Sequence, residues 1–225
     1  MIKNQGKKIT LFLVDGEPDG IKRITLGGWN GVGFIFPRNK LKEFSAEESS
    51  QKPGVYFLFG KESEENQTIT AYIGHIKNLL ERLNTHSHDP KKDFWHMTIV
   101  FIGTEILGPH ANYLESRCVE LATAANHFGY TLTNGNEPRQ ENLIQDDDKP
   151  AMDGFLENIK LILTTLGYPI LHKIEPRTTD DKENPLFFCQ NADAKAKGTA
   201  RMTNEGLIVY KGSVATTRHS EALVE

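Results

Sequence analysis

Short runs of alternating apolar and polar residues near the start of the chain predict β-strands. Residues 8–14 (KITLFLV) and 21–26 (IKRITL) flank the turn sequence DGEPDG, and a third apolar run, VGFIFP, ends at Pro37. These runs predict a small three-stranded β element over residues 1–45. Residues 43–52 (EFSAEESSQK) are polar and predict a linker to the next unit.

The central part of the chain begins with two apolar runs that predict a β-hairpin. GVYFLF at 54–59 and TITAYI at 68–73 are separated by the polar stretch GKESEENQ. After Gly74 the apolar residues recur at helical spacing. The residues on one helical face are Ile76, Leu79, Leu80 and Leu83, and those along its edge are Asn78, Arg82 and His86. The pattern therefore predicts two strands followed by an amphipathic helix.

A further strand and a further helix complete this region. The strand is predicted at Met97–Ile102, where β-branched and aromatic residues are concentrated. The helix is predicted over about 110–128, with Gly129 as its C-cap. Its predicted buried stripe is Leu114, Cys118, Leu121, Ala125 and Phe128. The order strand, strand, helix, strand, helix predicts a small antiparallel sheet flanked by helices, which is an α+β fold.

The last third of the chain predicts a linker, a helix and a small β-rich domain. Residues 137–151 are charged and poor in apolar residues, which is typical of a linker. A helix is expected near 151–166, ending at Gly167, and short β-like runs begin near residue 186. The predicted division is an N-terminal β element (1–45), a central domain (52–145), a connecting helix (150–172) and a small C-terminal β-rich domain (185–225).

Composition places the chain among globular proteins that stay out of the membrane. Of 225 residues, 38% are hydrophobic and 25% are charged, and no apolar run is long enough to span a bilayer. No secretory signal is recognised. Cys118 and Cys189 form no CxxC or zinc-type cluster, so reduced thiols in a cytoplasmic protein are expected. The formal net charge of −4 gives no global attraction to nucleic acid, so any basic groups that bind a polyanion must be locally concentrated.

The residue types around the hairpin suit phosphodiester hydrolysis. That reaction needs a base to activate water, positive charge near the phosphate and help for the leaving oxygen. A tyrosine can serve as a base when nearby cations lower its pKa. Arg82 supplies a permanently charged fork that fits phosphate oxygens, and Glu115 can hold a divalent ion. In isolation each of these residues is an ordinary packing residue or surface charge, and only their joint pattern points to catalysis.

The segments Gly54-Val55-Tyr56 and Tyr72-Ile73-Gly74, followed by Arg82, resemble the two motifs of the GIY-YIG nuclease family. Val55 stands in place of the middle isoleucine of the first motif. The resemblance covers residues 54–136. It implies a GIY-YIG core, with a small three-stranded antiparallel sheet flanked by helices and small β-rich elements at both ends of the chain.

The resemblance also implies a role for each matching residue. Tyr56 would help to activate the nucleophilic water, and Tyr72 would belong to the same hydrogen-bonded cluster. Gly74 would let the chain turn into the helix, and Arg82 would stabilise charge on the phosphate. The remaining matches are His86, found in many members, Glu115 as the metal-binding glutamate, and Asn134 as the residue that closes the site. Asn136 competes with Asn134 for that last position.

The function implied by this resemblance is a metal-dependent endonuclease that hydrolyses phosphodiester bonds of DNA with one Mg²⁺ or Mn²⁺. A cytoplasmic, bacterial enzyme of repair, restriction or phage defence is expected. The C-terminal run GLIVYKGSVA resembles a small domain of unknown function that accompanies this nuclease domain in bacterial proteins. Two alternatives stay open: a catalytically inactive module that binds nucleic acid or protein, and a nuclease acting on RNA. The sequence indicates no oligomeric state.

Overall fold

The chain divides into two compact units, Met1–His172 and Lys173–Glu225. The structure, a computed structural model, describes residues 6–61, 68–76, 93–127, 129–135, 144–173, 186–191, 196–203, 206–210 and 212–215. No helix among these residues is long and apolar enough to cross a membrane. The fold is of the α+β class, as the sequence predicts.

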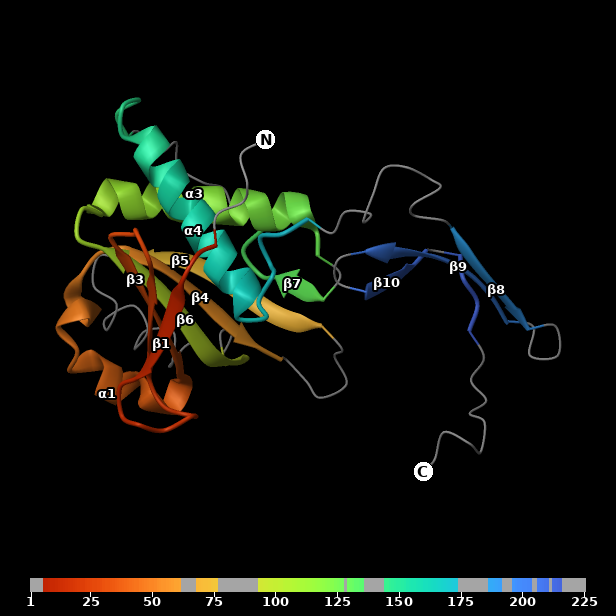
Figure 1. Cartoon of the computed structure of the whole chain (residues 1–225), viewed down its shortest axis with the longest axis horizontal. Helices are drawn as coiled ribbons and strands as arrows, with labels where there is room; N and C mark the ends of the chain where they lie inside the picture. Colours follow the sequence, from red (N-terminus) through yellow and green to blue (C-terminus); the bar gives the residue numbers. More distant parts are fainter. Residues whose placement is uncertain are drawn as a thin grey trace. The chain divides into compact units, whose positions relative to one another are not determined.

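The first unit is built on a seven-stranded sheet with the order β1-β2-β3-β6-β4-β5-β7 (Figure 1). All neighbouring strands are antiparallel except β5 and β7, which are parallel. The strands are β1 (Ile9–Leu13), β2 (Lys22–Leu26), β3 (Gly31–Pro37), β4 (Gly54–Gly60), β5 (Ile69–Ile76), β6 (Trp95–Gly103) and β7 (Tyr130–Leu132). The three strands predicted for the central domain are neighbours in the order β5-β4-β6, but they belong to this larger sheet and not to a small three-stranded one.

The three N-terminal strands form as predicted, but they extend the central sheet. β3 pairs with β6 along its whole length, from Gly31 opposite Gly103 to Pro37 opposite Met97. The sequence suggested a separate β element over 1–45 because pairing between strands so far apart in the chain leaves no local signal.

The segment predicted as a linker over 43–52 is folded onto the sheet. It forms part of α1 (Leu41–Ser45) and a 3₁₀ turn at Glu48–Gln51. Phe44 is completely buried, and its ring stacks on that of Phe36 with centroids 4.4 Å apart. One large aromatic side chain thus anchors an otherwise polar stretch, since burying it contributes about 1.5–3 kcal/mol.

Helix α3 (Gly108–Ala125) follows β6 and packs on β4 and β5. Its buried residues are Ala111, Leu114, Cys118, Val119 and Ala122. The helix ends at Asn126, whose φ of 43° is left-handed, so the predicted C-cap at Gly129 is wrong. Asparagine tolerates this conformation better than most residues with a side chain. Phe128, predicted on the buried stripe, lies outside the described residues.

Helix α4 (Lys149–Thr165) begins inside the predicted linker, with Pro150 in its first turn. Its end is as predicted. Gly167 has a φ of 85°, the Gly167 N–H donates to the Thr164 carbonyl at 3.1 Å, and the Tyr168 N–H donates to the Leu163 carbonyl at 2.8 Å. This pair of bonds is the Schellman motif, which satisfies the last carbonyls of a helix.

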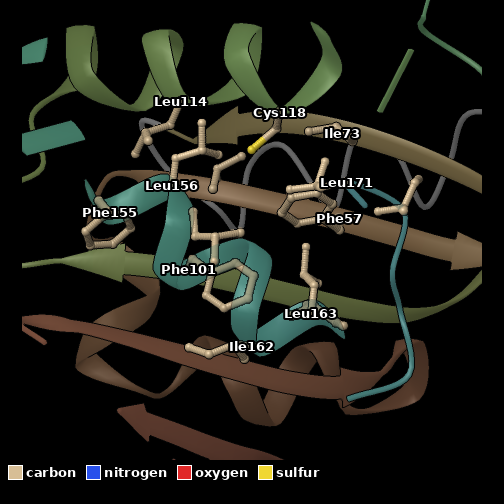
Figure 2. Packing of buried hydrophobic residues seen from close by; sticks show 14 of the residues in the cluster. Phe57, Ile73, Phe101, Leu114, Cys118, Phe155, Leu156, Ile162, Leu163 and Leu171 are labelled. Carbon is tan, nitrogen blue, oxygen red and sulfur yellow. The ribbon is translucent and has the colours of Figure 1, made fainter. Parts of the chain in front are cut away.

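Side chains on the two faces of the sheet form two separate clusters. We call the face covered by α3 and α4 the helix face; Figure 2 shows Leu114 and Cys118 of α3 packed over Phe57 and Ile73 of the sheet. The opposite face, which we call the tyrosine face, carries Tyr56, Leu58, Tyr72, Trp95, Val100 and Ile102 together with Phe34, Phe36 and Phe44. Successive residues of a strand point to opposite faces, so neighbours in β4 and β5 belong to different clusters.

The second unit contains a three-stranded antiparallel sheet with the order β10-β9-β8. Its strands are β8 (Phe187–Asn191), β9 (Ala196–Thr203) and β10 (Gly206–Val209). The predicted C-terminal β-rich domain therefore contains strands at the expected places. Most of its described apolar side chains are exposed, including Phe188 at 76% and Val209 at 59%.

Candidate active site

The described site residues meet at the C-terminal end of β5, where three successive residues each contact one of them. Ile73 is hydrogen-bonded to Asn134, Gly74 lies against Tyr56, and His75 is hydrogen-bonded to Glu115. Tyr72 precedes these three residues. Residues from Tyr56 to Asn134 are thus brought to one short stretch of strand.

The two motif tyrosines lie side by side on the tyrosine face. Tyr56 is opposite Gly74 in the β4–β5 ladder, and Tyr72 is two positions from Gly74 on the same face. The ring centroids of Tyr56 and Tyr72 are 6.1 Å apart, with the planes tilted by 31°. Both are buried, Tyr56 completely and Tyr72 with 5% of its surface exposed. The structure therefore brings the predicted tyrosine pair together.

Gly74 has a different role from the predicted one. It lies within β5 and not at a turn, and its φ is not in the left-handed region. A Cβ atom at this position would be 2.5 Å from both Cζ and the hydroxyl oxygen of Tyr56. Because real Cβ contacts are longer, only glycine lets the Tyr56 ring cross the strand here. The glycine of the second motif makes room for the tyrosine of the first.

Glu115 lies on the helix face, opposite the tyrosines. It is on α3 next to the buried Leu114, and its carboxylate forms a short hydrogen bond with Nδ1 of His75. The alternation of β5 places His75 on the same face as Ile73, away from Tyr72. Both side chains keep partial contact with solvent, 29% for His75 and 20% for Glu115. Glu115 and the tyrosines thus approach β5 from two sides.

His75 is the site residue that the sequence reading missed. It follows the second motif directly. Because alternate residues of a strand share one face, His75 is expected on the same face as Ile73 and on the opposite face from Tyr72. The nearby Cys118 is a free, completely buried thiol, and burial, followed by the negative charge of Glu115, raises its pKa. A raised pKa disfavours the reactive thiolate.

Asn134 is fastened to the backbone of β5. Its Nδ2 group donates to the Ile73 carbonyl at 2.7 Å, and its Oδ1 atom accepts from the Ile73 N–H at 3.4 Å. The side chain is buried, with 4% exposed. The Asn134 amide thus forms the two backbone hydrogen bonds that a neighbouring strand would form with Ile73. These bonds hold the segment after β7 beside the end of β5. Asn136 lies outside the described residues.

Arg82 and His86 also lie outside the described residues, so their predicted roles stay predictions. The chain leaves the described part at Ile76 and returns at Asp93. The stretch between them therefore starts directly after the residues that contact Tyr56 and Glu115.

The donor set around Glu115 fits a divalent ion with few protein ligands. Within the described ranges, no three His, Cys, Asp or Glu side chains are grouped to hold a metal ion. Magnesium often takes only one or two carboxylates and completes its shell with water and phosphate oxygens. Carboxylate and water oxygens also suit manganese. The partly exposed Glu115 carboxylate meets this requirement.

No protein-family model, curated protein or solved structure matches the chain. Any functional assignment therefore depends on the motif residues and on their geometry around β5.

Proposed function

We propose that the protein is a metal-dependent endonuclease of the GIY-YIG type that hydrolyses phosphodiester bonds of DNA. The observation that carries the proposal is the meeting of Tyr56, Glu115 and Asn134 at three successive residues of β5. The order β5-β4-β6, with α3 after β6, also agrees with the small antiparallel sheet and flanking helices that the resemblance implies. The segment with Arg82 and His86 continues from the same end of β5.

In the proposed reaction, the Tyr56 hydroxyl assists the attack of water on the phosphorus atom. Tyr72, whose ring lies beside that of Tyr56, would belong to the same hydrogen-bonded cluster, as the resemblance implies. Arg82 neutralises charge that develops on the phosphate oxygens, as its forked guanidinium allows. The resemblance assigns His86 to orienting the reacting groups or relaying protons. Asn134 fixes the β5 backbone against which Tyr56 rests.

Glu115 would hold the single Mg²⁺ or Mn²⁺ that the reaction requires. A bound divalent ion supplies charge stabilisation for the leaving oxygen. His75 hydrogen-bonds the Glu115 carboxylate and fixes its orientation. Polar groups that orient a metal ligand typically change metal affinity 10- to 100-fold when removed, on the order of 1–3 kcal/mol. We therefore assign His75 a positioning role.

The proposed substrate and biological role are those that the resemblance to the GIY-YIG family implies. A cytoplasmic bacterial enzyme acting on DNA in repair, restriction or phage defence is proposed, with RNA as the alternative substrate. The C-terminal sheet places Lys197 and Arg201 on one face by strand alternation, since their positions differ by an even number in β9. Paired basic groups of this kind suit contact with a phosphate backbone.

One observation favours a second candidate, a module that binds nucleic acid or protein without turnover. Tyr56 has no exposed surface, and Glu115 lies on the opposite face of the sheet. A nucleophilic water must reach both the base and the phosphate, so an active enzyme needs the end of β5 to open toward its substrate.

The test is cleavage of supercoiled, linear and branched DNA with Mg²⁺ or Mn²⁺ by the full chain. The variants are Arg82→Ala, Glu115→Ala and Glu120→Ala. Glu120 is the matched control, because it lies on the same helix, is 61% exposed and contacts only Arg117 among the interactions seen. The proposal expects metal-dependent nicking that is lost in the first two variants and kept in the third. DNA binding without any cleavage by the wild-type chain would favour the second candidate. Cleavage of RNA and not of DNA by the wild-type chain would make RNA the substrate of the proposed nuclease.

A further inference from the structure

β1 forms one edge of the seven-stranded sheet and has few of the features that protect such edges. Within the part of the chain that the structure describes, it pairs only with β2. Its five residues, ITLFL, include no charge and no proline. Leu11 is 47% exposed, Phe12 52% and Leu13 37%. Natural edge strands are usually shortened, charged, bulged or covered, because a bare apolar edge is a template for another strand.

The hydrogen-bonding direction of β1 is fixed by its neighbour. The Gly27 N–H donates to the Lys8 carbonyl at 2.9 Å, and the Val14 N–H donates to the Ile21 carbonyl at 2.8 Å. Even-numbered residues therefore direct their backbone groups toward β2, and odd-numbered ones toward the outer edge. The backbone groups of Ile9, Leu11 and Leu13 thus face outward.

We propose that this edge binds the same edge of a second copy of the chain, joining two sheets through antiparallel β1 strands. A two-fold axis at Leu11 would place Leu11 opposite its copy and Ile9 opposite Leu13. All three are residues whose backbone groups face outward, so each would form hydrogen-bonded pairs with the second strand. On the helix face the apolar stripe of these side chains would continue across the axis. Phe12 would lie opposite Thr10 on the other face.

The same register makes the flanking charges complementary. Residues whose numbers add to 22 are opposite each other, so Lys7 of one copy lies opposite Asp15 of the other, twice across the axis. Within one chain the Lys7 ammonium group donates to the Asn158 side chain at 3.4 Å. The Asp15 carboxylate, in the bend that follows β1, accepts from the Glu17 N–H at 3.3 Å and lies 3.4 Å from the Lys40 ammonium group. Lys7 and Asp15 stand two residues before and two residues after β1. Exposed ion pairs contribute little individually, about 0.2–1 kcal/mol each, and act mainly on register and specificity.

The first test is the mass of the full chain by sedimentation, from low to high micromolar concentration. The expected result is a reversible shift from 25.3 kDa toward twice that mass. Leu11→Lys is expected to remain monomeric at every concentration, because an edge lysine opposes strand addition. Leu207→Lys, which changes a 54% exposed leucine on β10, is expected to dimerise like the wild type. A monomeric wild type, or dimerisation lost only in Leu207→Lys, would overturn the proposal.

The second test addresses the register. Lys7→Asp and Asp15→Lys are each expected to raise the dimer dissociation constant about tenfold, since each creates like-charge pairs. The double variant Lys7→Asp/Asp15→Lys restores opposite charges across the axis and is expected to regain wild-type affinity. Loss of the contacts with Asn158, Glu17 or Lys40 cannot produce such a rescue. A double variant as weak as the worse single variant would contradict the proposed register.

Discussion

The two faces of the central sheet are both buried, but they carry different chemistry. The helix face consists of aliphatic and aromatic side chains packed under α3 and α4 (Figure 2). The hydrogen-bonded pair of His75 and Glu115 lies on this side, at the end of β5. The tyrosine face has two phenols, Tyr56 and Tyr72, within its core. Candidate catalytic groups thus lie on both faces, the two tyrosines on one and Glu115 with His75 on the other.

This difference locates the candidate site at one end of β5. Tyr56 and Glu115 are on opposite faces, but they contact the adjacent residues Gly74 and His75. Groups from both faces can act together only around the end of this strand. The comparison therefore predicts that substitutions of the buried apolar side chains on the helix face act on stability, and that substitutions of Tyr56 and Glu115 act on cleavage.

The largest expected effect is on stability, from Phe57→Ala on the helix face. Phe57 is completely buried, and its ring is 6.2 Å from that of Phe59 and 6.0 Å from that of Phe101. Removing a large core aromatic costs about 3–5 kcal/mol. Denaturant unfolding of the full chain measures this loss. A change below about 1 kcal/mol would show that the helix face is not packed as described.

The next effect tests the space made by Gly74. In Gly74→Ala the new methyl group would meet the buried Tyr56 ring, so a loss of about 1–3 kcal/mol in unfolding free energy is expected. Gly154→Ala is the control, because its Cβ would have no atom within 4 Å and it lies inside α4. The control is expected to gain up to about 1 kcal/mol, the difference in helix propensity. Equal effects of the two substitutions would contradict the close approach of Gly74 to Tyr56.

A smaller and more specific effect is expected from His75→Asn. If His75 positions Glu115, the divalent-ion concentration for half-maximal cleavage should rise about 10- to 100-fold, with cleavage recovered at saturating ion. A change of stability alone would leave that concentration unaltered. If the divalent-ion concentration for half-maximal cleavage is unchanged, His75 does not position Glu115 and serves only in packing.

The sequence predicts local elements well when their signals are local. The Gly167 end of α4 and the strands around Tyr56 and Tyr72 are of this kind, because a left-handed glycine and short apolar runs next to a polar turn sequence determine them directly. The sequence does not predict the attachment of β3 to β6 or the burial of Phe44, because each depends on partners distant in the chain. Gly74 shows the same limit, since its contact is a residue on the opposite strand.

For the candidate site, the motif pattern alone predicted the pairing of the tyrosines and named Glu115 and Asn134. It did not predict that Glu115 would approach β5 from the other face, because that depends on how α3 packs on the sheet. It also passed over His75, whose partner is 40 positions away. A motif can thus identify candidate site residues, whereas their positions relative to one another depend on how the chain folds.

The most direct test of the account is a double-mutant cycle on DNA cleavage with Tyr56→Phe and Glu115→Ala. Tyr56→Phe removes only a hydroxyl, so its stability should stay within about 1.5 kcal/mol of the wild type. If the two faces form one catalytic site, each substitution lowers the cleavage rate about 100-fold or more. The cleavage rate of the double variant is then close to that of the less active single variant. Effects that multiply, or a fully active Glu115→Ala, would contradict a single site at the end of β5.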